Sequence, residues 1–527
     1  MALSFLRPFL ASSQPVDATA APMTLREINL AMIALTMSIF VAMLSNLVVL
    51  TALPRIVADL KGTQAAYTWI ITSSMLTITV CTPIWGRISD LLNKKRLMQL
   101  CVVGYVLASV VAGLAPAVWV MIACRVIIGI CAGGIIVLMQ SISVAITSPR
   151  HRAKWIGYRG AVMSVATVGA PSLGGFITEH FGWRWCFFVG VPVAIASIIM
   201  VQRTLRLPAN PPMPEPRPTV DWAGALLLSC GITAVMLWVS VVGPGAGWMS
   251  PQGLALIALG MCILAFTIGF ELRVPFPILP VELFRQREVL LCVLAAVGTG
   301  IAFFGSSVFL AIYLQIGRGL RPDVAGLMAL PEAAGTLIGA MVGSRFIARH
   351  GRYRIVIIVG SGMILTGFAV LATIGTTTPL ALVGVCVALI GGGLGMAAEN
   401  LVLVVQTAVA SSKVGAAGAL VAFFRILGGV LCVAVMGAIL SAHVAAEMMH
   451  SGVTDYDASS VPNVERLSGA LRVLIEAAYA HGASLVYLAC VPAALLILGC
   501  ALLLPERTLE PDVLSPPDPL VEVEMAV

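Results

Sequence analysis

The stretch Gly157–Gly175, GYRGAVMSVATVGAPSLGG, decides the fold, because it is apolar, rich in small residues and interrupted by Pro171. In lipid, small residues on a helix face let two backbones approach closely, since no hydrophobic drive exists between helices already in hydrocarbon. Proline at membrane depth makes a kink that neighbouring helices must repair. The stretch therefore predicts a tightly packed, hinge-like membrane helix, with a plain Gly/Ala packing face as the alternative.

The composition predicts a polytopic membrane protein. Of 527 residues, 59% are hydrophobic and 10% are charged, whereas soluble domains carry about 25% charged residues. We identify fourteen apolar spans, each long enough for a bilayer that requires about 20 residues. The spans lie near 28–53, 66–84, 97–115, 118–147, 154–178, 184–204, 221–242, 252–271, 289–316, 323–347, 354–374, 378–409, 414–442 and 482–504.

Lysine and arginine in the short loops predict the orientation. With the N-terminus in the cytoplasm, 21 of the 31 Lys and Arg residues fall in inner segments and 7 in outer ones. We therefore expect a multi-pass protein of the cytoplasmic (inner) membrane with both termini inside and an outer loop at 443–481. Inner loops facing anionic lipid explain the net charge of +7 without nucleic acid.

Several function classes lack their motifs in this chain. No lysine completes a G-x-x-x-x-G-K-[ST] phosphate loop, so ATP hydrolysis by that route is not expected. The 12 cysteines form no C-x-x-C pair, and the histidines near the outer loop lack H-x-x-x-H spacing, so no metal site is expected. A membrane receptor or intramembrane enzyme would need a signalling domain or a catalytic constellation, and we identify neither.

A basic motif follows the second span, in the pattern G-x-x-x-D-R-x-G-R-[KR]. Its matching positions are Gly86, Asp90, Lys94, Lys95 and Arg96. Leu91 and Asn93 stand in place of the Arg and Gly. The motif resembles the inner-face gating motif of the major facilitator superfamily, in which the acid can cap a helix or pair across the two halves.

The opening stretch resembles G-x8-G-x3-G-P-x2-G-G, a fifth-helix hinge motif associated with antiporters in that superfamily. The corresponding positions are Gly157, Ala166, Ala170, Pro171, Gly174 and Gly175, the two alanines replacing glycines. With Arg125-x-x-Ile-Gly129 and Arg425-x-x-Gly428-Gly429, the chain is similar to the fourteen-helix drug:proton antiporter branch over about residues 28–507.

This resemblance implies an all-α fold of two six-helix bundles with two inserted helices. The expected domains are an N-terminal cytoplasmic tail, a first bundle, inserted helices 7 and 8 with linkers, a second bundle and a C-terminal cytoplasmic tail. Their bounds are 1–27, 28–206, 207–287, 288–507 and 508–527.

Two acids lie within the spans, and we take Glu332 and Glu399 as the proton-coupling candidates. The acid usual in the family's first helix is replaced by Ser45. A carboxylate in a low-dielectric environment holds its proton more readily than one in water, and intramembrane acids are usually functional. Either acid could instead be only a structural partner of the embedded charges Arg125 or Arg425. Candidate substrate-cavity residues are Ser45, Asn46, Gln140 and Asn400.

The resemblance implies alternating-access export of small amphipathic or cationic drugs in exchange for protons. The proton gradient drives this exchange, with no cofactor and no catalytic residue. A dedicated exporter of one natural product, siderophore or lipid is the alternative. The expected partners are the substrate, protons and the bilayer, with the chain acting as a monomer. In a double-membrane bacterium, a periplasmic adaptor and an outer-membrane channel join them.

Overall fold

The computed structural model describes residues 23–61, 64–207, 221–238, 250–274, 277–278, 281–320, 322–410, 413–451 and 469–506, and its elements are all helices. Twelve helices in this part of the chain are long and apolar enough to cross a membrane. Two of the fourteen expected spans are not among these twelve helices. One is α6 (Pro149–His180), whose first turns carry several charges, and the other is α9 (Trp222–Leu237), which has 16 residues.

The first bundle starts with strongly capped helices. Thr24 and Glu27 form a capping box at α2, and the side chain of Asn93 accepts hydrogen bonds from two N–H groups of α4. Ser148 caps α6 just before Pro149. The helices are α2 (Leu25–Asp59), α3 (Gln64–Leu91), α4 (Lys94–Gly113), α5 (Val118–Ile146), α6, α7 (Trp185–Phe188) and α8 (Gly190–Thr204).

The second bundle is built around α16, and its helices differ in length from the expected spans. Helix α17 continues to His450 and α18 begins at Gly469, so helix occupies both ends of the expected loop 443–481. The elements are η2 (Val281–Arg285), α12 (Arg287–Ile312), the π-helical η3 (Tyr313–Gly317), α13 (Pro322–Leu327), α14 (Leu330–His350), α15 (Tyr353–Leu371), α16 (Leu380–Ala408), α17 (Val414–His450) and α18 (Gly469–Leu503).

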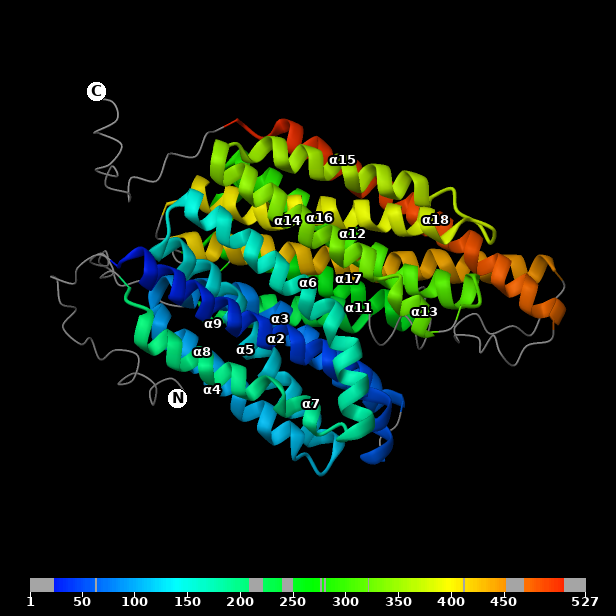
Figure 1. Cartoon of the computed structure of the whole chain (residues 1–527), viewed down its shortest axis with the longest axis horizontal. Coiled ribbons are helices and arrows are strands. Elements are labelled where there is room, and N and C mark those ends of the chain that lie inside the picture. The colour runs from blue at the N-terminus through cyan, green and yellow to red at the C-terminus, as the bar shows by residue number, and fades with distance from the viewer. Residues whose placement is uncertain are drawn as a thin grey trace, which may run out of the picture.

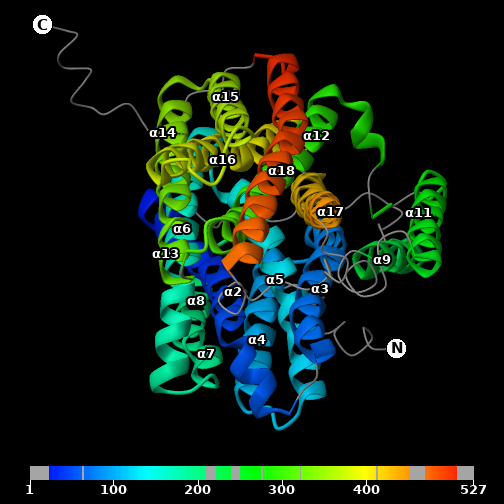
Figure 2. The ribbon, with the colours of Figure 1, turned by 90° about the vertical axis from the view of Figure 1, so that its right-hand side faces the viewer.

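The inserted helices α9 and α11 (Pro251–Glu271) pack against each other to one side of the bundles, next to α3 and α17 (Figure 2). A small apolar cluster that includes Leu228 and Ile232 of α9 and Phe423 of α17 holds them there. Because α3 and α17 belong to different bundles, the insert lies along the seam between the two.

The described contacts between the bundles gather at one end, which we call the Asp90 end. Helix α2 begins and α18 finishes at this end (Figure 1). A Cβ added to Gly86 of α3 would lie 3.2 Å from the Cα of Ala416 in α17. One added to Gly157 of α6 would lie 2.8 Å from the Cβ of Ser344 in α14. Close approach of two backbones therefore joins the bundles at both places.

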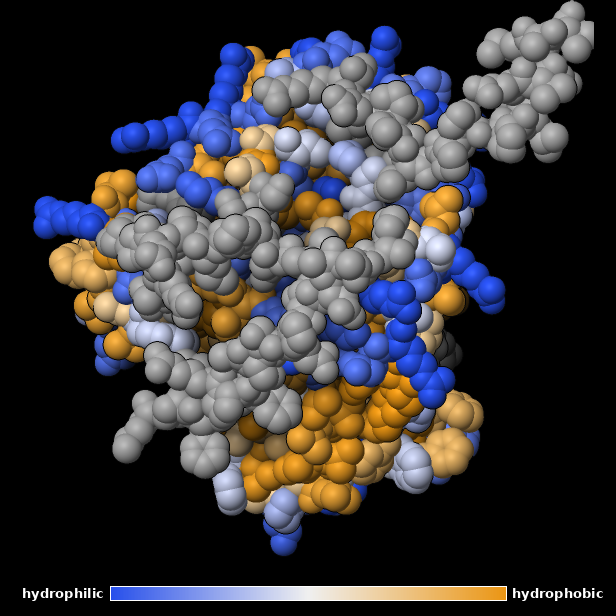
Figure 3. Space-filling view, turned by 90° about the vertical axis from the view of Figure 1, so that its left-hand side faces the viewer, coloured by the Kyte–Doolittle hydropathy of each residue, from blue (hydrophilic) through white to orange (hydrophobic). Residues whose placement is uncertain are grey.

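Further along α6 the packing changes partner. Gly169 and Gly175 face open space, whereas Arg55 of α2 donates a hydrogen bond to the carbonyl oxygen of Thr178 at 2.7 Å. Helix α6 thus crosses to the second bundle at its start and returns to its own bundle at its end. The Asp90 end presents hydrophilic side chains above a broad apolar surface (Figure 3).

Candidate functional site

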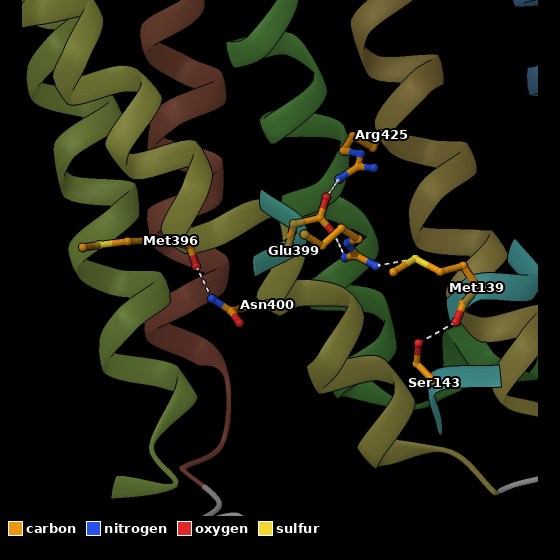
Figure 4. Close-up of polar contacts among 7 residues, drawn as sticks. Met139, Ser143, Met396, Glu399, Asn400 and Arg425 are labelled. Atoms are coloured by element: carbon orange, nitrogen blue, oxygen red, sulfur yellow. Dashed lines mark hydrogen bonds and ion pairs between the residues drawn. The ribbon is translucent and has the colours of Figure 1, made fainter. Parts of the chain in front are cut away.

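An ion-pair triad joins the bundles through Glu399 of α16. One of its carboxylate oxygens pairs with Arg159 of α6, and the other accepts a hydrogen bond from Arg425 of α17 at 3.0 Å (Figure 4). The side chain of Arg159 is 7% exposed and that of Glu399 is 23% exposed. Buried charges are costly unless paired, so each member stabilises the others in this position.

The triad bears on the two interpretations of Glu399. As a structural partner it was expected to meet Arg425 or Arg125, and it meets Arg425. Its second partner, Arg159, was missed, although an arginine inside an apolar helix, two residues after Gly157, is a signal that an acid lies nearby. Two guanidinium groups thus pair with one carboxylate, from both bundles.

The second embedded acid, Glu332, has neutral neighbours. It lies buried in the first turn of α14, where it accepts hydrogen bonds from Ser306 at 2.6 Å and Ser307 at 3.2 Å, both in α12. No ion pair to it occurs in the described part of the chain. The turn residues 328–329 separate α13 from α14, so the expected span 323–347 is divided between two helices.

Arg125 of α5 is buried without a carboxylate among its described partners. It donates to the side-chain oxygen of Asn46 at 3.0 Å and to the carbonyl of Ile70 at 3.1 Å. Asn46 also accepts from Ser74 at 3.0 Å. Ser45 instead faces α8, since a Cβ on Gly190 would lie 2.8 Å from its hydroxyl. Of these two candidates, Asn46 is therefore the partner of Arg125.

Asp90 caps a helix of the opposite bundle. Its two carboxylate oxygens accept hydrogen bonds from the N–H groups of Gly415 and Ala416, each at 3.0 Å, at the start of α17. A carboxylate at a helix N-terminus is stabilised by the unpaired N–H groups and the helix dipole. Lys95 turns inward to α8, where its ammonium group donates to the carbonyl of Leu205 at 2.7 Å. Lys94 and Arg96 lie beside it in the first turn of α4.

The antiporter-like stretch is only partly a contact face. Gly157 meets α14, and Ala166 and Ala170 are buried, whereas Gly175 faces open space. Helix α6 is continuous through Pro171, whose side chain lies outside the described residues. Helix α6 thus packs closely against α14 at the start of the motif, and the role of the motif as a hinge stays a prediction.

The remaining cavity candidates lie near the Asp90 end. Gln140 of α5 lines a cavity of about 20 Å³ between the bundles. Asn400 of α16 is buried and donates to the carbonyl of Met396 in its own helix at 2.6 Å (Figure 4). Its side-chain oxygen has no hydrogen-bond partner among the described residues. Gln140 is therefore the candidate that reaches the space between bundles.

Residues 35–433 match the family model of the Major Facilitator Superfamily, more than half of the chain. An uncharacterised MFS-type transporter of Mycobacterium tuberculosis is 30% identical over 505 residues, which cover 93% of this chain and 73% of that protein. The multidrug transporter protein MdtP of Bacillus subtilis is 29% identical over 411 residues, covering 77% of this chain and 74% of that protein.

Solved structures agree on the fold. The proton:xylose symporter XylE aligns over 92% of this chain and 98% of its own, with a TM-score of 0.57 and 12% identity. The human organic anion transporter MFSD10 aligns over 89% of this chain and 99% of its own, with a TM-score of 0.56 and 15% identity.

Because of the family model and the mycobacterial relative, the chain belongs to the major facilitator superfamily. It is a multi-pass membrane transporter and not an enzyme, and this assignment implies a small-molecule substrate.

Proposed function

We propose that the protein exports small amphipathic drugs and other toxic compounds across the cytoplasmic membrane in exchange for protons. The multidrug relative and the antiporter-like motif of α6 support export. The bias of basic residues supports a cytoplasmic Asp90 end and fourteen spans, with α6 and α9 among them. The chain works as a monomer in this proposal.

The neutral surroundings of Glu332 are the observation that supports proton coupling. A coupling group must change its charge between states, and arginine stays protonated. Glu399 is held by two cations, whereas Glu332 contacts two serine hydroxyls and no cation in the described structure. Hydroxyl groups can accept from a protonated carboxyl as well as donate to an ionised one. The surroundings of Glu332 therefore suit both of its protonation states.

The transport cycle requires the bundles to part at the Asp90 end. Four of the described links between the bundles then break: Asp90 with the start of α17, Gly157 with α14, Arg159 with Glu399, and Arg152 with Gln406. Glu399 keeps Arg425 throughout, because α16 and α17 belong to the same bundle. Arg425 therefore keeps Glu399 paired after the bundles part. A buried charge without a partner would make the open state costly.

Efflux of a fluorescent substrate panel from everted vesicles, with and without an uncoupler, tests the function. Glu332→Gln keeps the shape and hydrogen bonding of the side chain but cannot take the proton, so we expect gradient-driven efflux to stop while substrate binding in detergent persists. Glu447→Gln, at an exposed glutamate near the end of α17, is the matched control and should pump normally. Normal pumping by Glu332→Gln would remove Glu332 from the mechanism.

The orientation has its own test. In a cysteine-free background, His450→Cys, at the far end of α17, should react with an impermeant maleimide from outside the cell. Arg349→Cys, at the Asp90 end of α14, should react only in everted vesicles. The opposite pattern would invert the proposed topology and the direction of transport with it.

A further inference from the structure

The cavity near the Asp90 end, which we call the Arg152 cavity, lies between the two bundles. Helices α2, α5 and α6 of the first bundle and α16 of the second surround its volume of about 20 Å³. That is room for about one water molecule. Its polar lining residues are Gln140, Ser143, Arg152, Trp155, Arg159 and Gln406.

The lining has cations without matching acids. Arg152 and Arg159 are both buried, and no carboxylate is among the described residues that line the cavity. Arg159 shares Glu399 with Arg425, so these three arginines have one acid between them. This departs from the usual rule that a buried charge is paired.

Arg152 shows the imbalance most clearly. Its guanidinium donates to the side-chain oxygen of Gln406 at 3.3 Å and to the carbonyl of Thr147 at 3.2 Å, and both acceptors are neutral. Its Nε has no hydrogen-bond partner in the described structure. A buried guanidinium with a free donor favours an anionic acceptor, because charge-assisted bonds to a carboxylate, sulfonate or phosphate are the strongest it can make.

Two amides complete the polar surface. A Cβ on Gly418 of α17 would lie 2.8 Å from the side-chain oxygen of Gln140 and 3.4 Å from the side-chain nitrogen of Gln406. The oxygen of Gln140 has no described hydrogen-bond partner. A carboxamide can present its NH₂ group by turning over, so Gln140 can add a donor to those of Arg152.

We propose that the Arg152 cavity, once the bundles part and widen it, binds the anionic oxygen group of an amphipathic substrate, whose apolar body then lies against the apolar wall of the same cavity. This rests on the proposed export function and changes its substrate class, since the family resemblance implies amphipathic or cationic compounds. Met32, Met139 and Val402 supply the apolar wall. Because α16 belongs to the second bundle, parting of the bundles widens the cavity and uncovers both arginines.

Three probes with one apolar body test this proposal: anthracene-9-carboxylate, the neutral anthracene-9-methanol and the cationic 9-anthracenylmethylammonium. Fluorescence titration of the full-length protein in detergent measures their affinities. We expect the carboxylate to bind at least about tenfold tighter than the alcohol, and the ammonium most weakly. Equal affinities, or tightest binding of the ammonium, would overturn the proposal.

Substitutions locate the site. Arg152→Gln should remove most of the carboxylate preference and leave the affinity for the alcohol unchanged, and Arg152→Lys should restore part of it. Arg203→Gln, an exposed arginine at the end of α8, is the control for loss of one positive charge. If Arg152→Gln does not fold, Gln140→Leu provides the second test, because it should weaken the carboxylate alone. An unchanged preference in a folded Arg152→Gln protein would refute the site.

The same anionic group could come from an organic acid or from a lipid. Competition with dihexanoyl phosphatidylglycerol at micellar dilution separates these sources. Displacement of the carboxylate assigns the cavity to phospholipid head groups, and its absence assigns it to organic acids. Binding in detergent needs no proton gradient. Loss of anion preference therefore refutes the substrate class alone, whereas loss of uncoupler-sensitive efflux refutes the proposed antiport alone.

Discussion

Arg159 and Glu399 form an ion pair that connects α6 of one bundle to α16 of the other. Arg425 holds the same carboxylate from within the second bundle. The three residues are therefore not equivalent: removing Glu399 leaves two arginines without their acid, whereas removing Arg159 leaves an intact pair. This asymmetry predicts different consequences for substitutions at the two ends of one ion pair.

Glu399→Gln should destabilise the protein more than Arg159→Gln does. Leaving an uncompensated buried charge costs about 3–5 kcal/mol. Arg159 would be such a charge, whereas the side chain of Arg425 is 28% exposed and loses less when its acid is removed. Arg159→Gln should cost clearly less, because Glu399 keeps Arg425. Thermal unfolding in detergent, followed by tryptophan fluorescence, measures both. Equal losses would show that Arg425 by itself does not stabilise the charge of Glu399.

Asp90→Asn should weaken the closed arrangement at the Asp90 end. The substitution removes the negative charge and one of the two acceptor oxygens at the start of α17, and a negative charge at a helix N-terminus is worth about 1 kcal/mol. We expect the population with a parted Asp90 end to rise about fivefold, as a change of that size implies. Spin labels at Arg203 of α8 and Arg349 of α14, both exposed, report the distance between bundles. A distance distribution identical to that of the parent protein would contradict the capping role.

Much of the fold was predictable from the sequence, because apolar spans and helix caps are local features. The ends of the expected loop 443–481 were not, since helices α17 and α18 extend through polar residues that a hydropathy pattern assigns to a loop. The break before α14 was missed for a related reason. Apolar residues continue through the turn at 328–329, so the pattern shows no interruption there.

The candidate site was predictable as a set of residues but not as a set of partnerships. Glu332, Glu399, Arg125 and Arg425 stand out because charge is rare in apolar spans. Which arginine meets which acid depends on packing between helices far apart in the chain. Asn46 rather than Ser45 meets Arg125 because one residue along a helix turns the side chain by about 100°, from one neighbouring helix to another.

Asn46→Leu should therefore be more damaging than Ser45→Ala. Leucine leaves the buried guanidinium of Arg125 without its side-chain acceptor, at a cost of about 1–3 kcal/mol. Ser45→Ala leaves that acceptor in place and should cost less. Unfolding temperatures of the two purified variants give the comparison. A greater loss for Ser45→Ala would mean that Asn46 does not support Arg125.

Gly157→Leu and Gly175→Leu test the α6 contact as a matched pair. Both lie in the same helix and the same motif, but a side chain at 157 meets the Cβ of Ser344 at 2.8 Å and the carbonyl oxygen of Ala340 at 3.1 Å, whereas one at 175 meets open space. Overpacking a close contact costs about 1–3 kcal/mol, and this cost falls on the state in which the Asp90 end is closed. We expect Gly157→Leu to reduce efflux about tenfold, since 1.4 kcal/mol, which lies within this range, is a factor of ten. Gly175→Leu should transport nearly normally at equal expression.

The spin-label pair on α8 and α14 should show a parted Asp90 end in Gly157→Leu alone. If both variants pump equally well, α6 and α14 do not need this close approach. If Gly175→Leu is the more impaired, the motif acts through its second half, around Pro171.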